Sequence, residues 1–435
     1  MERFALSRMK EWKENENRKP LIIRGARQVG KTWIMKTFGQ QYFEKTAYVN
    51  FDNNARMKQV FEGDLDIERL VLAISAETGV SIEAENTLII FDEIQEVPKA
   101  LTSLKYFHEN APQYAIVAAG SLLGVALHQG TSFPVGKVDF LDLYPLNFRE
   151  FLCAMGEKQF VSMLDSCDTQ MVTVFKTKYI ERLREYYFVG GMPEVVKDFS
   201  EKKDYNRVRV IKKNLINYYQ QDFSKHAEIK LVPRLNLVWN SIPMQLAKEN
   251  KKYIYGQVRE GSRAKDFELA IQWLLDCGLI HKVQRIQKPD LPLKAYIDFD
   301  AFKLFLVDIG LLIAMTDLDA KVIIEGNKIF TEFKGSLTEQ YILQQLISDV
   351  GVIPYYYSTQ NSKGEIDFLV QGKTSVIPIE VKAEENLKAK SLKAFCEKYQ
   401  PSYAVRTSMS DSREQDWMTN IPLYAIKWIE NYVNQ

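Results

Sequence analysis

A glycine-rich segment carries the clearest chemistry in the sequence. Residues 22–32 read Ile-Ile-Arg-Gly-Ala-Arg-Gln-Val-Gly-Lys-Thr, which places an apolar stretch directly before the spacing Gly-x-x-x-x-Gly-Lys-Thr. The two glycines let the backbone turn so that consecutive N–H groups point at a phosphate. The lysine would neutralise the β- and γ-phosphates, and the threonine hydroxyl would coordinate Mg²⁺. The predicted phosphate-binding residues are Gly25, Ala26, Arg27, Gln28, Val29, Gly30, Lys31 and Thr32.

A second apolar stretch ends in two acids. Residues 87–93 read Thr-Leu-Ile-Ile-Phe-Asp-Glu, a pattern typical of a buried parallel strand with carboxylates at its C-terminal end. Asp92 would share the Mg²⁺ with Thr32, and Glu93 would polarise the attacking water. A strand followed by a solvated acidic turn is the simpler alternative.

The elements that must position these residues alternate between strand and helix patterns. Further strands are expected at residues 47–51 and 114–121, with helical segments between them. This alternation predicts a parallel, doubly wound α/β sheet whose C-terminal edge forms a nucleotide crevice. Ser121 ends the last of these strands, and we expect its hydroxyl to lie near the γ-phosphate as a third catalytic residue beside Lys31 and Glu93.

Bulk properties narrow the class of protein. The chain has 435 residues, too many for a single core, and a net charge of +1, which argues against a strongly basic nucleic-acid binder. The four cysteines are widely scattered and only four histidines are present, so neither a disulfide framework nor a zinc site is expected. The N-terminus has no apolar signal core, and no apolar run is long enough to span a bilayer. We therefore expect a cytoplasmic protein without a membrane segment.

Together these residues resemble the AAA-like, archaeal-type P-loop ATPases related to the STAND group. The resemblance covers residues 25–32, the strand ending at Glu93, Gly120-Ser121 and the segment from Gly136 to Phe151. It implies binding and hydrolysis of ATP with Mg²⁺. The last segment usually begins Gly-Arg, whereas this chain has Lys137, and lysine cannot contact phosphate in the bidentate manner of arginine. Arg27 and Arg149 are alternative cations, although surface ion pairs would explain either.

The middle of the chain predicts two further parts. Residues 151–225 are helical in pattern, and their Gly-Gly-Met-Pro at 190–193 resembles a turn in the lid of this ATPase group. Residues 226–317 suggest a winged helix, with wing strands near 279–283 and 295–297. Arg263, Lys265 and Gln272 could approach DNA if the second helix reads a groove. Such modules also serve as lids or protein contacts.

The last part of the chain carries a second set of acids. Residues 362–370 and 375–382 look like adjacent strands, with Asp367 on the first and Glu380 and Lys382 on the second. Glu339 precedes them on a predicted helix. This arrangement resembles the PD-(D/E)xK nuclease fold. The resemblance implies that Asp367 and Glu380 bind Mg²⁺, that Lys382 positions water and that Glu339 supports the metal, a combination suited to phosphodiester cleavage.

The predicted architecture therefore has four parts: a P-loop ATPase domain (1–150), a helical lid (151–225), a winged-helix-like domain (226–317) and a PD-(D/E)xK-like α/β domain (318–435). One hypothesis is an ATP-gated DNA-processing enzyme that cuts at the C-terminal site. The other is a STAND-like regulatory ATPase that acts through protein partners, with an inactive C-terminal scaffold. ATP and Mg²⁺ are the expected cofactors under both hypotheses, and both allow the protein to form oligomers.

Overall fold

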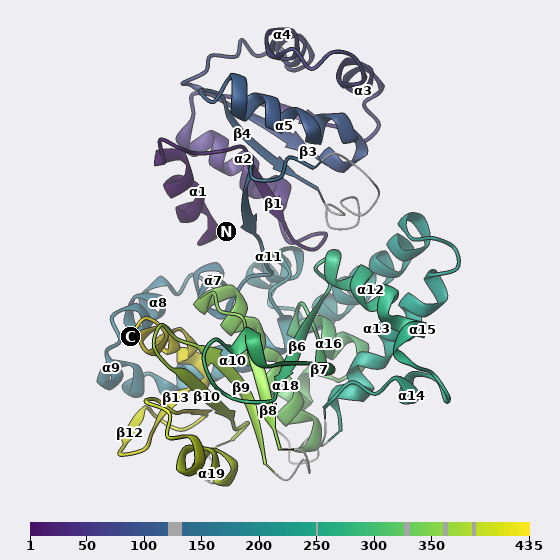
Figure 1. Cartoon of the computed structure of the whole chain (residues 1–435). Coiled ribbons are helices and arrows are strands. Elements are labelled where there is room, and N and C mark those ends of the chain that lie inside the picture. Colours follow the sequence, from purple (N-terminus) through teal and green to yellow (C-terminus); the bar gives the residue numbers. More distant parts are fainter. Residues whose placement is uncertain (121–132, 249–250, 326–330, 360–363, 385–388) are drawn as a thin grey trace. The chain divides into compact units, whose positions relative to one another are not determined.

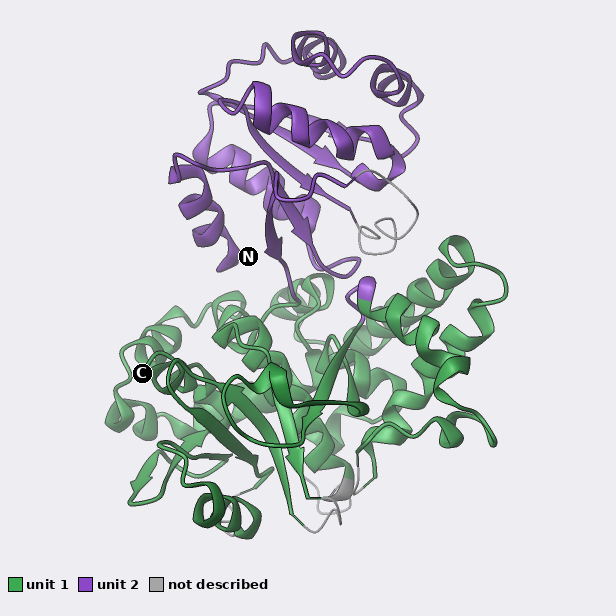
Figure 2. Cartoon of the chain, in the orientation of Figure 1, with its two compact units in different colours: residues 1, 145–275, 280–435 green, residues 2–144, 276–279 purple. Residues whose placement is uncertain are grey.

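The computed structural model describes residues 1–120, 133–248, 251–325, 331–359, 364–384 and 389–435. The chain forms two compact units (Figure 2). The N-terminal unit comprises residues 2–144 with 276–279, and the C-terminal unit comprises residue 1, residues 145–275 and residues 280–435. Ser121, the expected γ-phosphate sensor, lies outside the described residues.

The N-terminal unit is built on a five-stranded, fully parallel sheet with the strand order β2-β3-β4-β1-β5 (Figure 1). This confirms the predicted parallel α/β P-loop fold. β1 lies inside the sheet between β4 and β5, so its carboxyl end has a neighbouring strand on each side. The strands are β1 (Leu21–Arg24), β2 (Lys45–Asn50), β3 (Thr87–Asp92), β4 (Ala115–Ala119) and β5 (Asp139–Asp142); the helices are α1 (Ala5–Glu14), α2 (Lys31–Tyr42), α3 (Ala55–Glu62), α4 (Ile67–Thr78), η1 (Ile94–Glu96) and α5 (Pro98–Asn110).

Helices cover this sheet on both faces. α3, α4 and α5 pack through Phe61, Ile74 and Phe107 onto alternate strand residues such as Ile89 and Phe91. The strand residues that alternate with these point to the opposite face of the sheet, toward α2, where Leu88 lies beside Gly39. Because β3 is buried along its whole length, its apolar side chains exclude water right up to Asp92. The sheet thereby holds the acidic end of β3 in a fixed place.

The C-terminal unit begins with helices. Gly190 ends α10 with a φ of 78°, and Pro193 begins α11. A Cβ atom on Gly191 would lie 2.1 Å from the carbonyl oxygen of Leu146, so the turn requires glycine there. The helices of this unit are α7 (Phe148–Ala154), α8 (Lys158–Asp165), α9 (Thr169–Val174), α10 (Lys176–Val189), α11 (Pro193–Lys202), α12 (Tyr205–His226), α13 (Val232–Leu246), α14 (Tyr255–Val258), α15 (Ala264–Asp276), η2 (Leu293–Tyr296), α16 (Ile309–Met315), α17 (Ala320–Ile324), α18 (Thr331–Gln345), η4 (Leu346–Val350), α19 (Lys390–Tyr399), η5 (Leu423–Ile429) and α20 (Glu430–Val433).

An eight-stranded mixed sheet runs through the rest of this unit, in the order β12-β13-β11-β10-β9-β8-β6-β7. Its strands are β6 (Ile280–Ile286), β7 (Ile297–Leu306), β8 (Tyr355–Ser358), β9 (Glu365–Gln371), β10 (Val376–Val381), β11 (Val405–Ser408), β12 (Arg413–Gln415) and β13 (Met418–Pro422). The two strands expected to form a wing, β6 and β7, do pair with each other, but β6 also pairs in parallel with β8. One sheet therefore joins strands of the expected winged-helix-like domain to strands of the expected C-terminal domain. The winged helix stays a prediction.

Among the described residues, no helix combines the length and the apolar character needed to cross a membrane.

Candidate nucleotide site and carboxylate–lysine cluster

The glycine-rich segment forms a tight loop between β1 and α2. Gly25 has a φ of 145°, and Gly30 caps α2 with a φ of 95°. A Cβ atom on Gly25 would lie 2.1 Å from the carbonyl oxygen of Leu143, so only glycine fits. The loop therefore leads straight into the first turn of α2, whose backbone N–H groups and positive dipole end favour a bound phosphate.

Lys31 is the first residue of α2, and its side chain is buried. Its ammonium group donates hydrogen bonds of 2.8 Å to the carbonyl oxygens of Gly25 and Ala26. Burial lowers the pKa of Lys31 to about 8, against the opposing effect of Glu93 and Asp92. The ammonium is thus held over the loop, in the position from which it could neutralise a phosphate.

Asp92 lies at the end of β3 and accepts two side-chain hydrogen bonds on Oδ2. The donors are the Thr32 hydroxyl at 2.7 Å and the Tyr48 hydroxyl at 2.9 Å. The predicted pair of Thr32 and Asp92 is therefore brought together. Burial raises the pKa of Tyr48, and the neighbouring Asp92 raises it further, so this phenol stays protonated and acts as a donor. Hydroxyl and carboxylate oxygens are ligands that Mg²⁺ prefers, so Thr32 and Asp92 fit that ion.

Glu93 follows Asp92 with a left-handed backbone, at a φ of 51°. This conformation is uncommon outside glycine and redirects the chain as the strand ends. The carboxylate of Glu93 accepts a hydrogen bond of 2.7 Å from the Gln95 side chain. Glu93 is thus held beside Asp92 by its own backbone turn and by Gln95.

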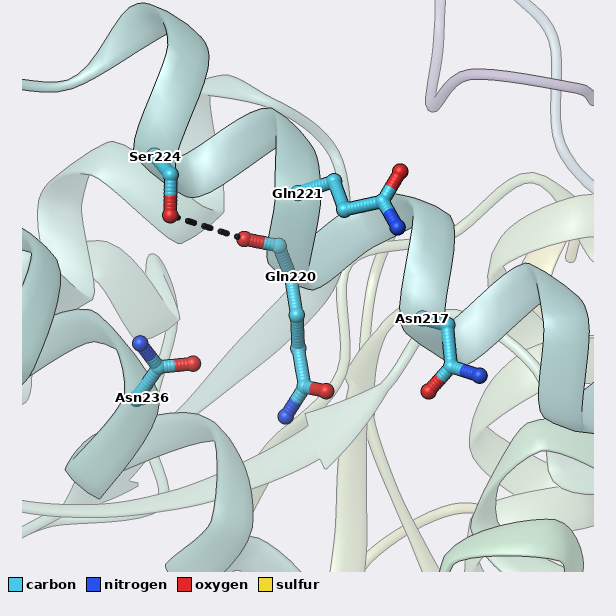
Figure 3. A pocket seen from close by; sticks show the side chains of 5 residues that line it. All are labelled: Asn217, Gln220, Gln221, Ser224 and Asn236. Atoms are coloured by element: carbon cyan, nitrogen blue, oxygen red, sulfur yellow. Dashed lines mark hydrogen bonds between the residues drawn. The ribbon is translucent and has the colours of Figure 1, made fainter.

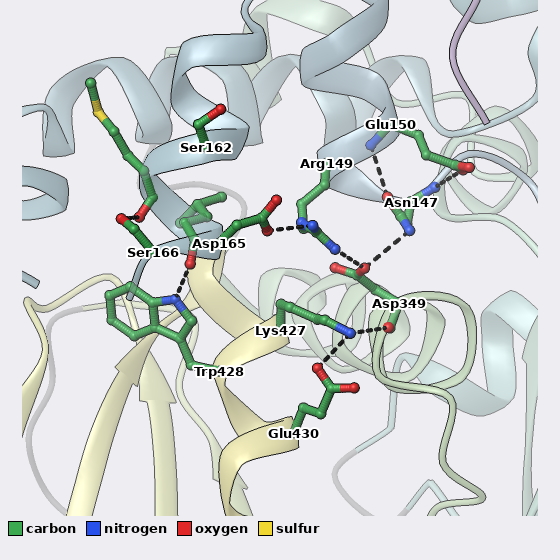
Figure 4. Close-up of polar contacts among 12 residues, drawn as sticks. Asn147, Arg149, Glu150, Ser162, Asp165, Ser166, Asp349, Lys427, Trp428 and Glu430 are labelled. Carbon is green, nitrogen blue, oxygen red and sulfur yellow. Dashed lines mark hydrogen bonds and ion pairs between the residues drawn. The ribbon is translucent and has the colours of Figure 1, made fainter. Parts of the chain in front are cut away.

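Two of the candidate cations, Lys137 and Arg149, lie in ion pairs. Lys137 contacts Glu109 at 3.0 Å. Arg149 belongs to the C-terminal unit, where it pairs with Asp349 at 2.8 Å and with Asp165 (Figure 4). Asn147 donates to the same Asp349 oxygen, which joins α7 to η4. Arg149 is therefore held in ion pairs, but its side chain is only 12% exposed, so these are not the surface pairs that the sequence suggested.

The acids of the C-terminal unit also come together, from α18, β9 and β10. The Lys382 ammonium lies 2.6 Å from Glu380. Asp367 Oδ2 accepts a hydrogen bond of 2.7 Å from the backbone N–H of Val381. Glu339 is buried within the same group and interacts electrostatically with Asp367 and Glu380. The four predicted side chains, Glu339, Asp367, Glu380 and Lys382, therefore do converge.

Two lysines that the sequence analysis did not single out complete this group. Lys303 on β7 is fully buried and lies 2.5 Å from Glu365 and 3.7 Å from Glu339. Lys251, in the connection between α13 and α14, pairs with the other oxygen of Glu339. We call these seven residues the carboxylate–lysine cluster: Lys251, Lys303, Glu339, Glu365, Asp367, Glu380 and Lys382.

The pKa values in the cluster follow burial and charge. Burial and the carboxylates of Glu339 and Glu380 raise the pKa of Asp367 well above its ordinary value. Burial also tends to raise the pKa of Glu339, but Lys251 and Lys303 hold it below its usual range. Glu339 is consequently the charged acid of this pair, and Asp367 is the one that favours its proton.

A third feature is a shallow pocket of about 480 Å³ on α12 and α13 (Figure 3). Four amides and one hydroxyl line it, so it offers hydrogen bonds rather than acid–base chemistry. The lining residues are Asn217, Gln220, Gln221, Ser224 and Asn236.

Three family models match different parts of the chain. Residues 17–152 match a model described as an AAA domain, residues 180–322 match a domain of unknown function (DUF8612), and residues 334–426 match another domain of unknown function (DUF4143). The AAA match covers the phosphate loop, Asp92 and Glu93. The N-terminal unit therefore has a parallel α/β P-loop fold, and its residues 17–152 are similar to an AAA domain.

Several solved structures show some likeness to the chain. The Walker-type ATPase PABY2304 of Pyrococcus abyssi is 15% identical with a TM-score of 0.44, and covers 72% of this chain and 95% of its own. The ORC1 protein of Aeropyrum pernix, solved in complex with DNA, is 14% identical with a TM-score of 0.27, and covers 72% of this chain and 91% of its own. No curated protein matches the chain.

Proposed function

Since residues 17–152 match an AAA domain, we propose that the protein binds ATP with Mg²⁺ and hydrolyses it. The observation that carries this proposal is the convergence of Lys31, Thr32 and Asp92 at the carboxyl end of the parallel sheet. Nothing in the residues favours guanine, because the sequence lacks an Asn-Lys-x-Asp motif.

Each residue has a distinct part in this proposal. The backbone of residues 25–30 and the Lys31 ammonium hold the phosphates and neutralise their charge. Thr32 and Asp92 would hold Mg²⁺, which supplies further charge neutralisation when bound. Glu93 orients the attacking water as a general base. Ser121 is proposed to read the γ-phosphate.

Steady-state ATP hydrolysis with Mg²⁺ tests the proposal, with Lys31→Ala as the blank. We expect a rate that depends on Lys31. A rate that is equal in the two proteins would reject the proposal. A background rate that neither Lys31→Ala nor Glu93→Gln changes would instead favour a nucleotide-binding scaffold that does not hydrolyse.

There are two candidates for the process that ATP hydrolysis drives. Convergence of Glu339, Asp367 and Glu380 favours ATP-gated DNA processing through a PD-(D/E)xK-like domain. The ion pairs of these carboxylates with lysines favour a STAND-like switch, in which the C-terminal unit serves as a scaffold for a protein partner. We place the switch first, because the acids already have cationic neighbours within the protein.

A cleavage assay separates the two forms. Duplex and single-stranded DNA are incubated with Mg²⁺ and ATP, using wild type, Asp367→Ala and Glu380→Ala. The switch predicts intact DNA in every case and an ATPase rate that DNA does not change. Cleavage by wild type that both variants lose, or a DNA-stimulated ATPase, would establish DNA processing.

The cytoplasmic location is proposed on the basis of the sequence.

A further inference from the structure

One ammonium group of the carboxylate–lysine cluster, that of Lys303, is completely buried. Lys303 lies within the apolar stretch of β7, between the buried Phe302 and Leu304, and its side chain is fully buried. A buried ammonium needs charged or polar partners, and it has two, Glu365 on β9 and Glu339 on α18. Lys303 therefore ties a helix to the sheet through opposite charge.

Lys251 enters the cluster from a different segment. It precedes α14 and pairs with Glu339 Oε1, while Lys303 lies on the side of Oε2. Its side chain is 14% exposed, whereas that of Lys303 is fully buried. Both oxygens of Glu339 are consequently turned toward ammonium groups.

The remaining oxygens do not form a ready metal site. Asp367 uses Oδ2 to accept from the N–H of Val381, and Glu380 Oε1 pairs with Lys382. Within the described ranges, no three side chains of His, Cys, Asp or Glu are arranged to hold a metal ion. Glu339 Oε2 and Glu380 Oε2, however, are buried and have no hydrogen-bond partner, since Lys303 lies 3.7 Å from the former. The acids are thus residues of the type that binds metal cations, but in this arrangement they pair with the lysines already present.

We propose that Lys251 and Lys303 are the resident cations of this cluster, and that a divalent cation binds Glu339 and Glu380 only when Lys251 is removed. The inference rests on the switch form of the proposed function, and gives the acids a structural role as partners of the lysines. Lys251 and Lys303 are the two ammonium groups beside Glu339, so loss of one of them leaves negative charge that Mn²⁺ could neutralise. Of these two, Lys251 is the removable cation because its side chain is partly exposed, whereas Lys303 is enclosed.

The test measures the melting temperature of nucleotide-free full-length protein with and without Mn²⁺. Wild type is compared with Lys251→Ala, with Lys251→Met, which keeps the aliphatic stem, and with Lys251→Ala/Glu380→Gln. Lys334→Ala is the matched control, because it removes another ion pair of α18, with Glu384, outside the cluster. Mn²⁺ binding to the folded state alone raises the melting temperature by mass action.

We expect Mn²⁺ to raise the melting temperature of either Lys251 variant by about 2–4 °C, and to leave wild type, Lys334→Ala and the double variant unchanged. A Glu380-dependent rise in wild type would overturn the proposal, as would the lack of a rise in both Lys251 variants. Since no nucleotide is present, these outcomes are independent of ATP hydrolysis, so failure here leaves the ATPase proposal standing.

Discussion

The Tyr48 hydroxyl donates a hydrogen bond of 2.9 Å to Oδ2 of Asp92, from the strand that lies next to the one ending in Asp92. The same oxygen accepts from Thr32, so two protein donors fix the orientation of one carboxylate. Groups that orient a metal-binding carboxylate from behind also tune its affinity for the metal. Tyr48 is therefore a positioning residue in the proposed nucleotide site.

Tyr48→Phe removes one of these donors and leaves the ring in place. We expect the Mg²⁺ concentration that half-saturates ATP hydrolysis to rise about tenfold, because the Asp92 carboxylate loses a partner that orients it. The measurement is the ATPase rate against Mg²⁺ concentration at saturating ATP. Tyr114→Phe, a change in the same unit away from Asp92, is the control; equal curves for the two variants would contradict the role of Tyr48.

Glu93→Gln keeps the size and the hydrogen-bonding capacity of the side chain but removes its basicity. Loss of a general base should lower the maximal ATPase rate about 10²–10⁴-fold, while ATP affinity stays near that of wild type. Single-turnover hydrolysis and equilibrium binding of a fluorescent ATP analogue measure the two quantities. Glu96→Gln changes a nearby exposed acid and should leave both unchanged. Weakened binding with an unaffected rate would assign Glu93 to another role.

ATP affinity should depend on pH through Lys31, whose pKa lies near 8 in the protein without nucleotide. Below pH 8 the ammonium is charged before ATP arrives. Above it, the lysine must take up a proton as the phosphates bind, so the Kd for ATP rises by up to about tenfold per pH unit. Calorimetry in buffers of different ionisation enthalpy measures this uptake. Lys31→Arg stays charged throughout, and proton uptake equal to that of wild type would reject the assignment.

Gly25→Ala places a methyl group against the backbone of Leu143, where a Cβ atom would come within 2.1 Å. Gly79→Ala is matched, because Gly79 also has a positive φ, of 69°, but has open space around it. Gly79→Ala should cost about 1–2 kcal/mol in the free energy of unfolding from backbone strain alone. Gly25→Ala should cost more and also abolish ATP binding. Urea unfolding and ATP titration measure both, and equal costs would show that the loop relaxes.

Local patterns predicted much of the N-terminal unit. The strand before Gly25 and the strand ending at Asp92 are visible in the sequence because each is a short apolar run whose end carries the chemistry. The contact of Thr32 with Asp92 follows from parallel strands that end at one edge. Tyr48 was missed because a hydroxyl on a predicted strand has many acceptors available, and only the register of β2 against β3 selects Asp92.

Nonlocal pairing accounts for what the sequence could not show in the C-terminal unit. β6 pairs with β8 through Arg285 and Tyr356, and no local pattern encodes that contact. Lys303 did leave a signal, since a lysine within Ala-Phe-Lys-Leu-Phe-Leu at 301–306 is a charge in an otherwise apolar strand. A buried lysine requires a charged or polar partner, but the identity of that partner depends on the fold.

The pairing of β6 with β8 has a consequence for how the chain can be divided. Residues 180–322 and 334–426 match separate family models, yet their strands are neighbours in one sheet. A fragment that starts at residue 318 would present β8 as a bare edge, with unpaired N–H and C=O groups where β6 had been. Such edges recruit strands from other molecules and promote aggregation. We therefore expect the two segments to stay in solution only when they are expressed together.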